Sequence, residues 1–259
     1  MKSTSGRRRV SRLLDSIAFL ALALVLAWLA GTSIVRQTHY VDLYRAARTL
    51  ERGQKLSLAA VERRSNDIER LIATRDCDDA SLRSGVTLSL AAIERRNPAL
   101  DFEGWAEALE RGRQLLRVAA ACSPHRGGFW ARLAVVERLI AASPGRVVPL
   151  AALSIRLAPA ELGVIRTRFQ LWRTASTWMP ADASAPLQAD MRTILRQAQL
   201  TDIRQMIGNS AALKQLAGRE ALQMDGERQT ELARLRFNEA AGAKRANRPR
   251  FDLLDKPRP

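Results

Sequence analysis

Two amphipathic segments punctuated by prolines lie in the middle of the chain, between Cys122 and Pro159. In the first, apolar residues recur every three or four positions, which predicts an amphipathic helix: Phe129, Leu133, Val136 and Ile140. The second segment, Val148 to Ala158, keeps this period and predicts an antiparallel partner helix. We expect Pro149 in its first turn, where the missing N–H removes no hydrogen bond.

The outer prolines of this pair, Pro124 and Pro159, lie 35 positions apart, close to the period of about 34 residues in tetratricopeptide (TPR) repeats. That register predicts which residues pack where helices cross, and they are Gly112, Leu116, Ala119, Trp130, Leu133 and Ala134. Glu137 departs from the repeat, because an aromatic residue is usual at its position. We therefore expect degenerate repeats, with an irregular all-α domain as the alternative.

An apolar run without a single charge extends over residues 17–35. At 1.5 Å per residue it is long enough to cross most of a hydrocarbon core of about 30 Å. Basic residues precede it, which predicts that the short tail stays in the cytoplasm and the rest is exported; they are Arg7, Arg8, Arg9 and Arg12. A cleaved signal peptide is the alternative, but Trp28 stands where a small residue is wanted before a cut at Gly31.

The composition favours helix over sheet. Hydrophobic residues make up 47% of the chain but aromatic residues only 5%, whereas strands are enriched in aromatic and β-branched residues. No segment shows sustained alternation of such residues with polar ones. The predicted fold class is all-α: one N-terminal transmembrane helix followed by a TPR-like solenoid of helical hairpins.

The chain is predicted to divide into five parts. They are a cytoplasmic basic tail (1–12), a transmembrane anchor (13–35), a periplasmic TPR-like domain (36–180), further C-terminal helices (181–237) and a disordered basic tail (238–259). Beyond the central pair, periodicity and caps predict helices over 40–50, 57–73, 79–96, 102–121, 187–207 and 210–237. A further helix is predicted from Glu161 through Trp172 to the stop at Trp178-Met179-Pro180.

The two cysteines, Cys77 and Cys122, both fall in the exported part. In an oxidising compartment two such thiols tend to pair, and closing a loop of this length stabilises the fold by about 3 to 4 kcal/mol in the chain-entropy model. Two unrelated buried thiols are the alternative. A zinc site is disfavoured because the only histidines, His39 and His125, make no recognised ligand spacing with the cysteines.

Catalytic motifs are missing from the sequence. It contains no Gly-rich phosphate loop, no His-Glu metal motif and no serine nucleophile elbow. Asp76, Asp78 and Asp79 cluster around Cys77, but capping of the next helix explains them more simply than a bound cation does. We expect a protein that is not an enzyme and that uses no cofactor and no metal.

The charge points to anionic partners. Lys and Arg number 42 against 26 Asp and Glu, a net charge of +16. Export argues against nucleic acid and favours anionic lipid or polysaccharide, although an arginine-rich solvated face would explain the same excess. The candidate binding residues are Arg132, Arg138, Arg166 and Arg168.

Two sequence segments resemble those of a known family: SPHRGGFWARLAVVER over 123–138 and LSIRLAPAELGVIRTR over 153–168. With the anchor and the Cys-Asp element, the chain resembles the polysaccharide-biosynthesis protein VpsP family of Gram-negative exopolysaccharide operons, over about Leu14 to Ile207. The resemblance implies a single-pass protein of the bacterial inner membrane that assists a polysaccharide polymerase or export machine. The alternatives are a binding module for an acidic polysaccharide and a general cell-envelope adaptor for division or secretion.

Overall fold

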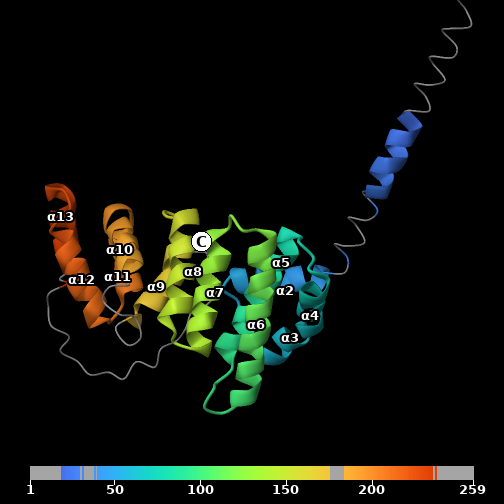
Figure 1. The fold of residues 1–259 in the computed structure, drawn as a ribbon, viewed down its shortest axis with the longest axis horizontal. Coiled ribbons are helices and arrows are strands. Elements are labelled where there is room, and N and C mark those ends of the chain that lie inside the picture. The colour runs from blue at the N-terminus through green and yellow to red at the C-terminus, as the bar shows by residue number, and fades with distance from the viewer. Residues whose placement is uncertain are drawn as a thin grey trace, which may run out of the picture. The chain divides into compact units, whose positions relative to one another are not determined.

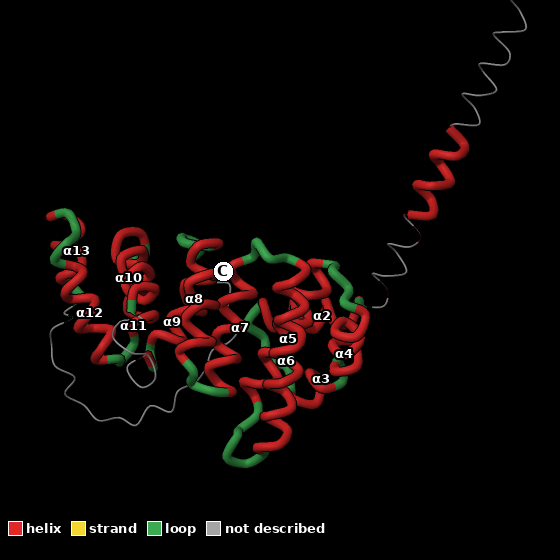
Figure 2. Tube along the Cα trace, in the orientation of Figure 1, coloured by secondary structure: helices red, strands yellow, loops and turns green. Residues whose placement is uncertain are grey.

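The computed structural model describes residues 19–29, 31, 38, 40–175, 184–235 and 237. Within these ranges the regular secondary structure is helical, and Figure 2 shows helices and loops but no strand. The helices labelled in Figure 1 are α2 (Val41–Glu51), α3 (Leu58–Glu62), α4 (Ser65–Thr74), α5 (Asp79–Arg95), α6 (Phe102–Cys122), α7 (Gly127–Ile140), α8 (Pro144–Leu157), α9 (Leu162–Trp172), α10 (Ala185–Gln197), α11 (Leu200–Ile207), α12 (Ala211–Ala221) and α13 (Gly226–Ala233). The predicted all-α class is confirmed.

The chain divides into two compact units, Met1–Asp42 and Leu43–Pro259. In the first unit residues 19–29 are helical, and their apolar side chains are exposed. No helix in the described part of the chain combines the length and apolarity that a membrane crossing requires. The predicted cytoplasmic tail and positions 13–18, 30 and 32–35 of the predicted anchor lie outside the described residues.

In the second unit the helices pack in a regular order along the chain. From α5 to α8 each helix packs against the next one, and beyond that point alternate helices also pack together. One layer contains α7, α9 and α11, and the other contains α8, α10 and α12. Pairing between neighbours and between alternate helices is the contact pattern of stacked helical hairpins.

Glycines allow the closest helix contacts around α5. A Cβ atom at Gly85 would lie 2.9 Å from Cδ1 of Leu71, and one at Gly112 would lie 3.0 Å from Cδ1 of Ile93. Both distances are shorter than an ordinary carbon–carbon contact. Gly112 therefore fills the predicted small packing position, between α6 and α5.

The start of α7 differs from the prediction. Helix α7 begins two residues before Phe129, the first residue of the predicted apolar stripe, and Gly127 and Gly128 form its first turn. A Cβ atom at Gly127 would lie 2.6 Å from Cβ of Ala158 and 2.9 Å from the Ser154 carbonyl oxygen. The helix can begin there because glycine lets its first turn touch the end of α8.

The next helix also begins earlier than expected. Helix α8 starts at Pro144, a favourable first position, so Pro149 lies inside the helix and not in its first turn. An interior proline normally removes a backbone hydrogen bond. The helix continues through it because its buried side chains hold it against neighbouring helices; they are Val147, Ala151 and Ser154.

Three predicted long helices are each divided into two. The range 57–73 forms α3 and α4, 187–207 forms α10 and α11, and 210–237 contains α12 and α13. At one of these breaks Ala198 and Gln199 both adopt extended backbone, with ψ near 155° and 152°. Residues 176–183, at the boundary between the predicted TPR-like domain and the predicted C-terminal helices, and the predicted disordered tail lie outside the described residues.

Candidate functional site

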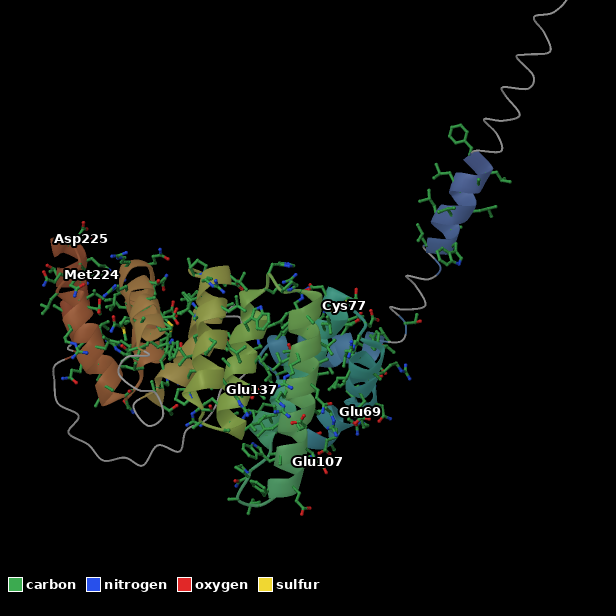
Figure 3. The ribbon with its side chains drawn as sticks, viewed as in Figure 1. Glu69, Cys77, Glu107, Glu137, Met224 and Asp225 are labelled. Atoms are coloured by element: carbon green, nitrogen blue, oxygen red, sulfur yellow. A yellow bond between two sulfur atoms is a disulfide. The ribbon has the colours of Figure 1, made fainter. Side chains whose placement is uncertain are left out.

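A disulfide joins Cys77, just before α5, to Cys122, the last residue of α6. The two Cα atoms are 5.2 Å apart. The predicted pairing is confirmed, and it fastens together the two ends of neighbouring helices. Cys77, which is labelled in Figure 3, is exposed to solvent, and Cys122 is partly exposed.

The aspartates beside the disulfide are used for capping and ion pairing. Asp78 accepts hydrogen bonds from the backbone N–H of Ser81 at 2.8 Å and from the Ser81 hydroxyl at 2.7 Å, and so caps α5. Asp79 pairs with Arg126, at the start of α7, with a distance of 2.7 Å from Nε to Oδ1. In the described part of the chain no group of three His, Cys, Asp or Glu side chains could hold a metal ion.

Tyr44 of α2 completes this polar cluster. Its hydroxyl lies 2.7 Å from the Ser81 hydroxyl and donates to Asp78 at 3.3 Å. Burial raises the pKa of Tyr44; the hydrogen bond with Ser81 lowers it less, and the charge of Asp78 raises it further. The cluster therefore holds a neutral phenol that links α2 to the start of α5.

Five of the six predicted packing residues are buried. They are Gly112, Leu116, Ala119, Leu133 and Ala134. Trp130 differs, because it remains partly exposed and its indole Nε1 donates to the Pro124 carbonyl oxygen at 2.8 Å. It joins the turn before α7 to that helix, whereas among the described tryptophans Trp172 of α9 is the fully buried one.

Glu137, which departs from the TPR pattern, is buried and paired. Its Oε1 atom accepts a hydrogen bond from Nη2 of Arg117 at 2.9 Å. Because Arg117 belongs to α6 and Glu137 to α7, an ion pair joins these helices where the repeat usually places an aromatic ring.

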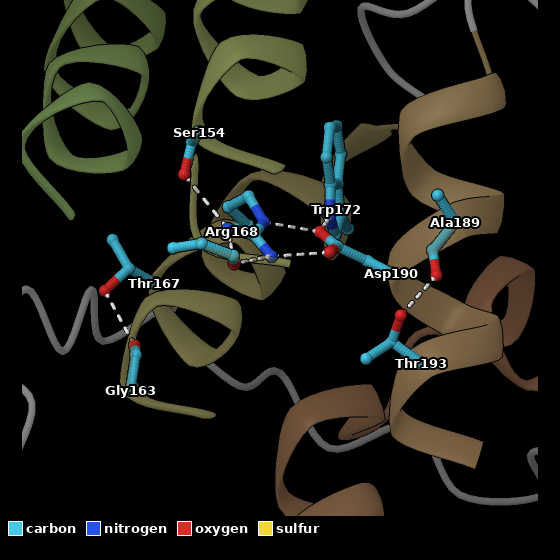
Figure 4. A network of polar contacts seen from close by, with 9 residues as sticks. Ser154, Gly163, Thr167, Arg168, Trp172, Ala189, Asp190 and Thr193 are labelled. Carbon is cyan, nitrogen blue, oxygen red and sulfur yellow. Dashed lines mark hydrogen bonds and ion pairs between the residues drawn. The ribbon is translucent and has the colours of Figure 1, made fainter. Parts of the chain in front are cut away.

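Arg168 was predicted to belong to a binding surface, and this prediction is wrong. Its side chain is fully buried and makes a two-pronged pair with Asp190 of α10, with Nε–Oδ2 at 2.8 Å and Nη2–Oδ1 at 2.7 Å (Figure 4). It also donates to the Ser154 hydroxyl at 3.0 Å and to the Ala158 carbonyl at 3.3 Å. Trp172 Nε1 donates to Asp190 Oδ2 at 2.7 Å.

The other three predicted arginines do not form one exposed face. Arg166 donates to Asp202 at 2.9 Å and so joins α9 to α11, with a quarter of its side chain exposed. Arg132 is partly buried, and its Nη1 donates to the Gly128 carbonyl of its own helix at 3.3 Å. Arg138 is also partly buried. The structure therefore does not bring the four predicted residues together as a binding surface.

Many arginines instead connect helices. Beyond the pairs already described, arginine–carboxylate pairs between helices are Arg111–Glu69 and Arg192–Glu220. Others donate to backbone carbonyls at helix ends, where a positive charge is favourable: Arg173 Nε donates to Met206 at 3.0 Å and Arg228 Nε to Leu195 at 2.6 Å. Many of the arginines therefore have partners inside the fold, although 1:1 pairs with carboxylates leave the net charge of +16 unchanged.

An exposed apolar surface lies at the start of α6, and sequence reasoning missed it. We call it the α5–α6 tip and define it as Leu100, Phe102 and Trp105. The first two side chains are 85% and 65% exposed, and the rings of Phe102 and Trp105 have centroids 6.0 Å apart. The available signal was the placement of two large apolar residues, Leu100 and Phe102, beside the Asn97-Pro98 turn, where a helix ends and the next begins.

Carboxylates adjoin this tip. Glu103 and Glu107 are exposed and lie one turn apart on α6, and Figure 3 labels Glu107 near the beginning of that helix. Asp101 caps α6 by accepting from the Gly104 N–H at 3.0 Å, and Arg96 donates to both Asp101 and Glu62. The α5–α6 tip is thus an apolar surface followed along α6 by two exposed glutamates, while Asp101 beside it is paired with Arg96.

No family model matches the chain, and no match was found among curated proteins or solved structures. The resemblance to the VpsP family therefore remains a prediction that depends on the two sequence segments 123–138 and 153–168.

Proposed function

We propose that this protein is a membrane-anchored, non-catalytic scaffold that docks a partner protein through its α5–α6 tip and assists exopolysaccharide polymerisation or export. The exposure of Leu100 and Phe102 carries the proposal. Burying such side chains against a partner is favourable, and clustered exposed apolar residues mark interaction sites. The predicted TPR-like solenoid of stacked helical hairpins is also an architecture that commonly serves as a binding scaffold.

The charge beside the tip favours a protein partner over an acidic polymer. Glu103 and Glu107 would repel a polyanion, whereas they complement a partner that presents apolar and basic residues together. The proposed partner is a component of the inner-membrane polymerase or export machine.

The proposed location is the bacterial inner membrane, with the N-terminus cytoplasmic and the C-terminal domain periplasmic. The apolar run 17–35 and the arginines before it support this topology. The disulfide is also typical of an oxidising compartment. A C-terminal alkaline phosphatase fusion should be active and sediment with membranes, and an inactive fusion would contradict the topology.

The docking test replaces the tip residues without disturbing the core. We expect Leu100→Ser/Phe102→Ser to melt like the wild-type chain but to reduce secreted polysaccharide severalfold. Leu222→Ser is the matched control, because Leu222 is 72% exposed and lies just after α12. Normal polysaccharide from the tip variant would contradict the proposal.

Direct binding of an acidic polysaccharide is the second candidate, and the net charge of +16 favours it. In that case the purified chain should bind the isolated polymer with an affinity that falls steeply as salt rises, and the tip variant should bind equally well. If deletion of the gene leaves polysaccharide amount and chain length unchanged, a general envelope adaptor becomes the better proposal.

A further inference from the structure

The first helix of the second unit has a strongly basic outer face. In α2 the buried residues Leu43, Ala47 and Leu50 form one stripe. At 100° per residue, the opposite side of the helix contains three arginines, which we call the α2 arginine face: Arg45, Arg48 and Arg52, the last just beyond the helix end. All three side chains are exposed.

The two carboxylates of this helix lie on its flanks. On a helical wheel Asp42 and Glu51 fall about 90° to either side of the arginine face. The face itself therefore presents guanidinium groups, which bind phosphate oxygens through paired N–H donors.

The position of α2 in the chain indicates which anion it would meet. Only residues 36–40 separate the predicted membrane span from Val41. Five extended residues reach at most about 17 Å, so a chain anchored by that span keeps α2 close to the lipid headgroups. A soluble polysaccharide has no comparable tether to this face.

We propose that the α2 arginine face binds the anionic phospholipid headgroups of the leaflet next to the exported domain. This inference rests on the proposed membrane anchor. Binding would restrict how the helical stack orients over the membrane, in addition to the tether itself, and would hold the stack in a defined orientation toward a membrane-embedded partner.

The test uses the full chain in lipid nanodiscs. One set contains only phosphatidylcholine, and in the other phosphatidylglycerol replaces a third of the lipid. An arginine-selective dicarbonyl reagent followed by peptide mass spectrometry measures the modification rate of each arginine. We expect the anionic lipid to slow modification of Arg45, Arg48 and Arg52 by about threefold or more, and high salt to remove this protection. Arg196 and Arg204, also exposed, are the internal references.

A charge-removal variant distinguishes lipid binding by the α2 arginine face from an effect of the total positive charge. In Arg45→Gln/Arg48→Gln/Arg52→Gln, anionic lipid should no longer slow amide hydrogen exchange in α2. The matched control Arg196→Gln/Arg204→Gln/Arg219→Gln removes the same charge from other exposed positions and should keep the effect.

The outcomes are distinguishable. A chain that does not co-elute with nanodiscs overturns the anchor and this inference together. A chain that co-elutes but shows no lipid-dependent protection overturns only the inference. If a soluble acidic polysaccharide added to neutral nanodiscs protects the α2 arginines as well as anionic lipid does, the face is assigned to polysaccharide and the lipid proposal fails.

Discussion

Arg168 of α9 and Asp190 of α10 form an ion pair in which neither side chain reaches solvent, with 2.7 Å between Nη2 and Oδ1. Removing two charges from water is costly unless hydrogen bonds replace the lost hydration. Here Ser154, the Ala158 carbonyl and the Trp172 indole supply those bonds (Figure 4). The pair therefore fixes how α8, α9 and α10 meet.

Breaking this pair should strongly destabilise the fold. We expect Asp190→Ala to lower the free energy of unfolding by about 3 to 5 kcal/mol, because it leaves a buried guanidinium without its counter-charge. Urea denaturation of the full chain in detergent measures the change. Replacing both residues, as in Arg168→Leu/Asp190→Leu, should recover much of the loss.

The control is a partly exposed pair on one helix, Glu110 with Arg113. The hydrogen bond from Arg113 lowers the pKa of Glu110, yet solvent screens this interaction. Glu110→Ala should cost no more than about 1 kcal/mol. An equally small cost for Asp190→Ala would show that the buried pair contributes no special stability.

The contact between α7 and α8 should not tolerate a side chain at Gly127. We expect Gly127→Ala to destabilise the fold by about 1 to 3 kcal/mol, because its Cβ would overlap Ala158 and the Ser154 carbonyl. Gly145→Ala is the control, since nothing lies within 4 Å of a Cβ there, and it should be neutral or stabilising by up to about 1 kcal/mol. The order of the two melting temperatures checks the prediction, and the reverse order would refute it.

Loss of the Cys77–Cys122 bond should lower stability by about 4 kcal/mol, because the bond closes a loop of 45 residues in the unfolded chain. Cys77→Ser, Cys122→Ser and the double variant should melt alike, as each removes the same cross-link. Non-reducing mass analysis of protein from its native compartment should show a loss of two hydrogens. Two thiols that alkylate freely without a reductant would contradict the pairing.

Tyr44 should make stability depend on alkaline pH. Burial raises its pKa in the folded state, so the folded chain retains the phenol proton to a higher pH than the unfolded chain does. The stabilising contribution is fully present below the unfolded pKa of about 10 and is lost as pH rises through the higher folded pKa. We expect Tyr44→Phe to lower stability by about 1 kcal/mol at neutral pH, because hydrogen bonds are lost. Between neutral pH and about pH 11 the variant should lose less stability than the wild-type chain does. Parallel urea titrations measure this difference, and equal alkaline losses in both proteins would rule it out.

The sequence alone was sufficient for the helical class and for several helices. The predicted range 79–96 corresponds to α5, and 102–121 corresponds to α6. Apolar spacing is a local property, and the caps at Asp78 and Asp101 are set by residues within one turn. The cysteine pairing could also be predicted, because two cysteines allow only one intramolecular bond.

Only the tertiary structure decided where long helices break and what the arginines do. No local pattern places Gly127 against the end of α8 or brings Arg228 to the Leu195 carbonyl at the end of α10. Arg168 looks like a surface residue in a helical stripe, yet Asp190, which is 22 positions away, makes its burial possible. The Leu100 and Phe102 side chains remain exposed for the converse reason, since no other segment of the described chain covers them. Periodicity predicts which residues lie on each face of a helix. Whether a charged or an apolar side chain is then buried depends on which distant residues the fold places beside it.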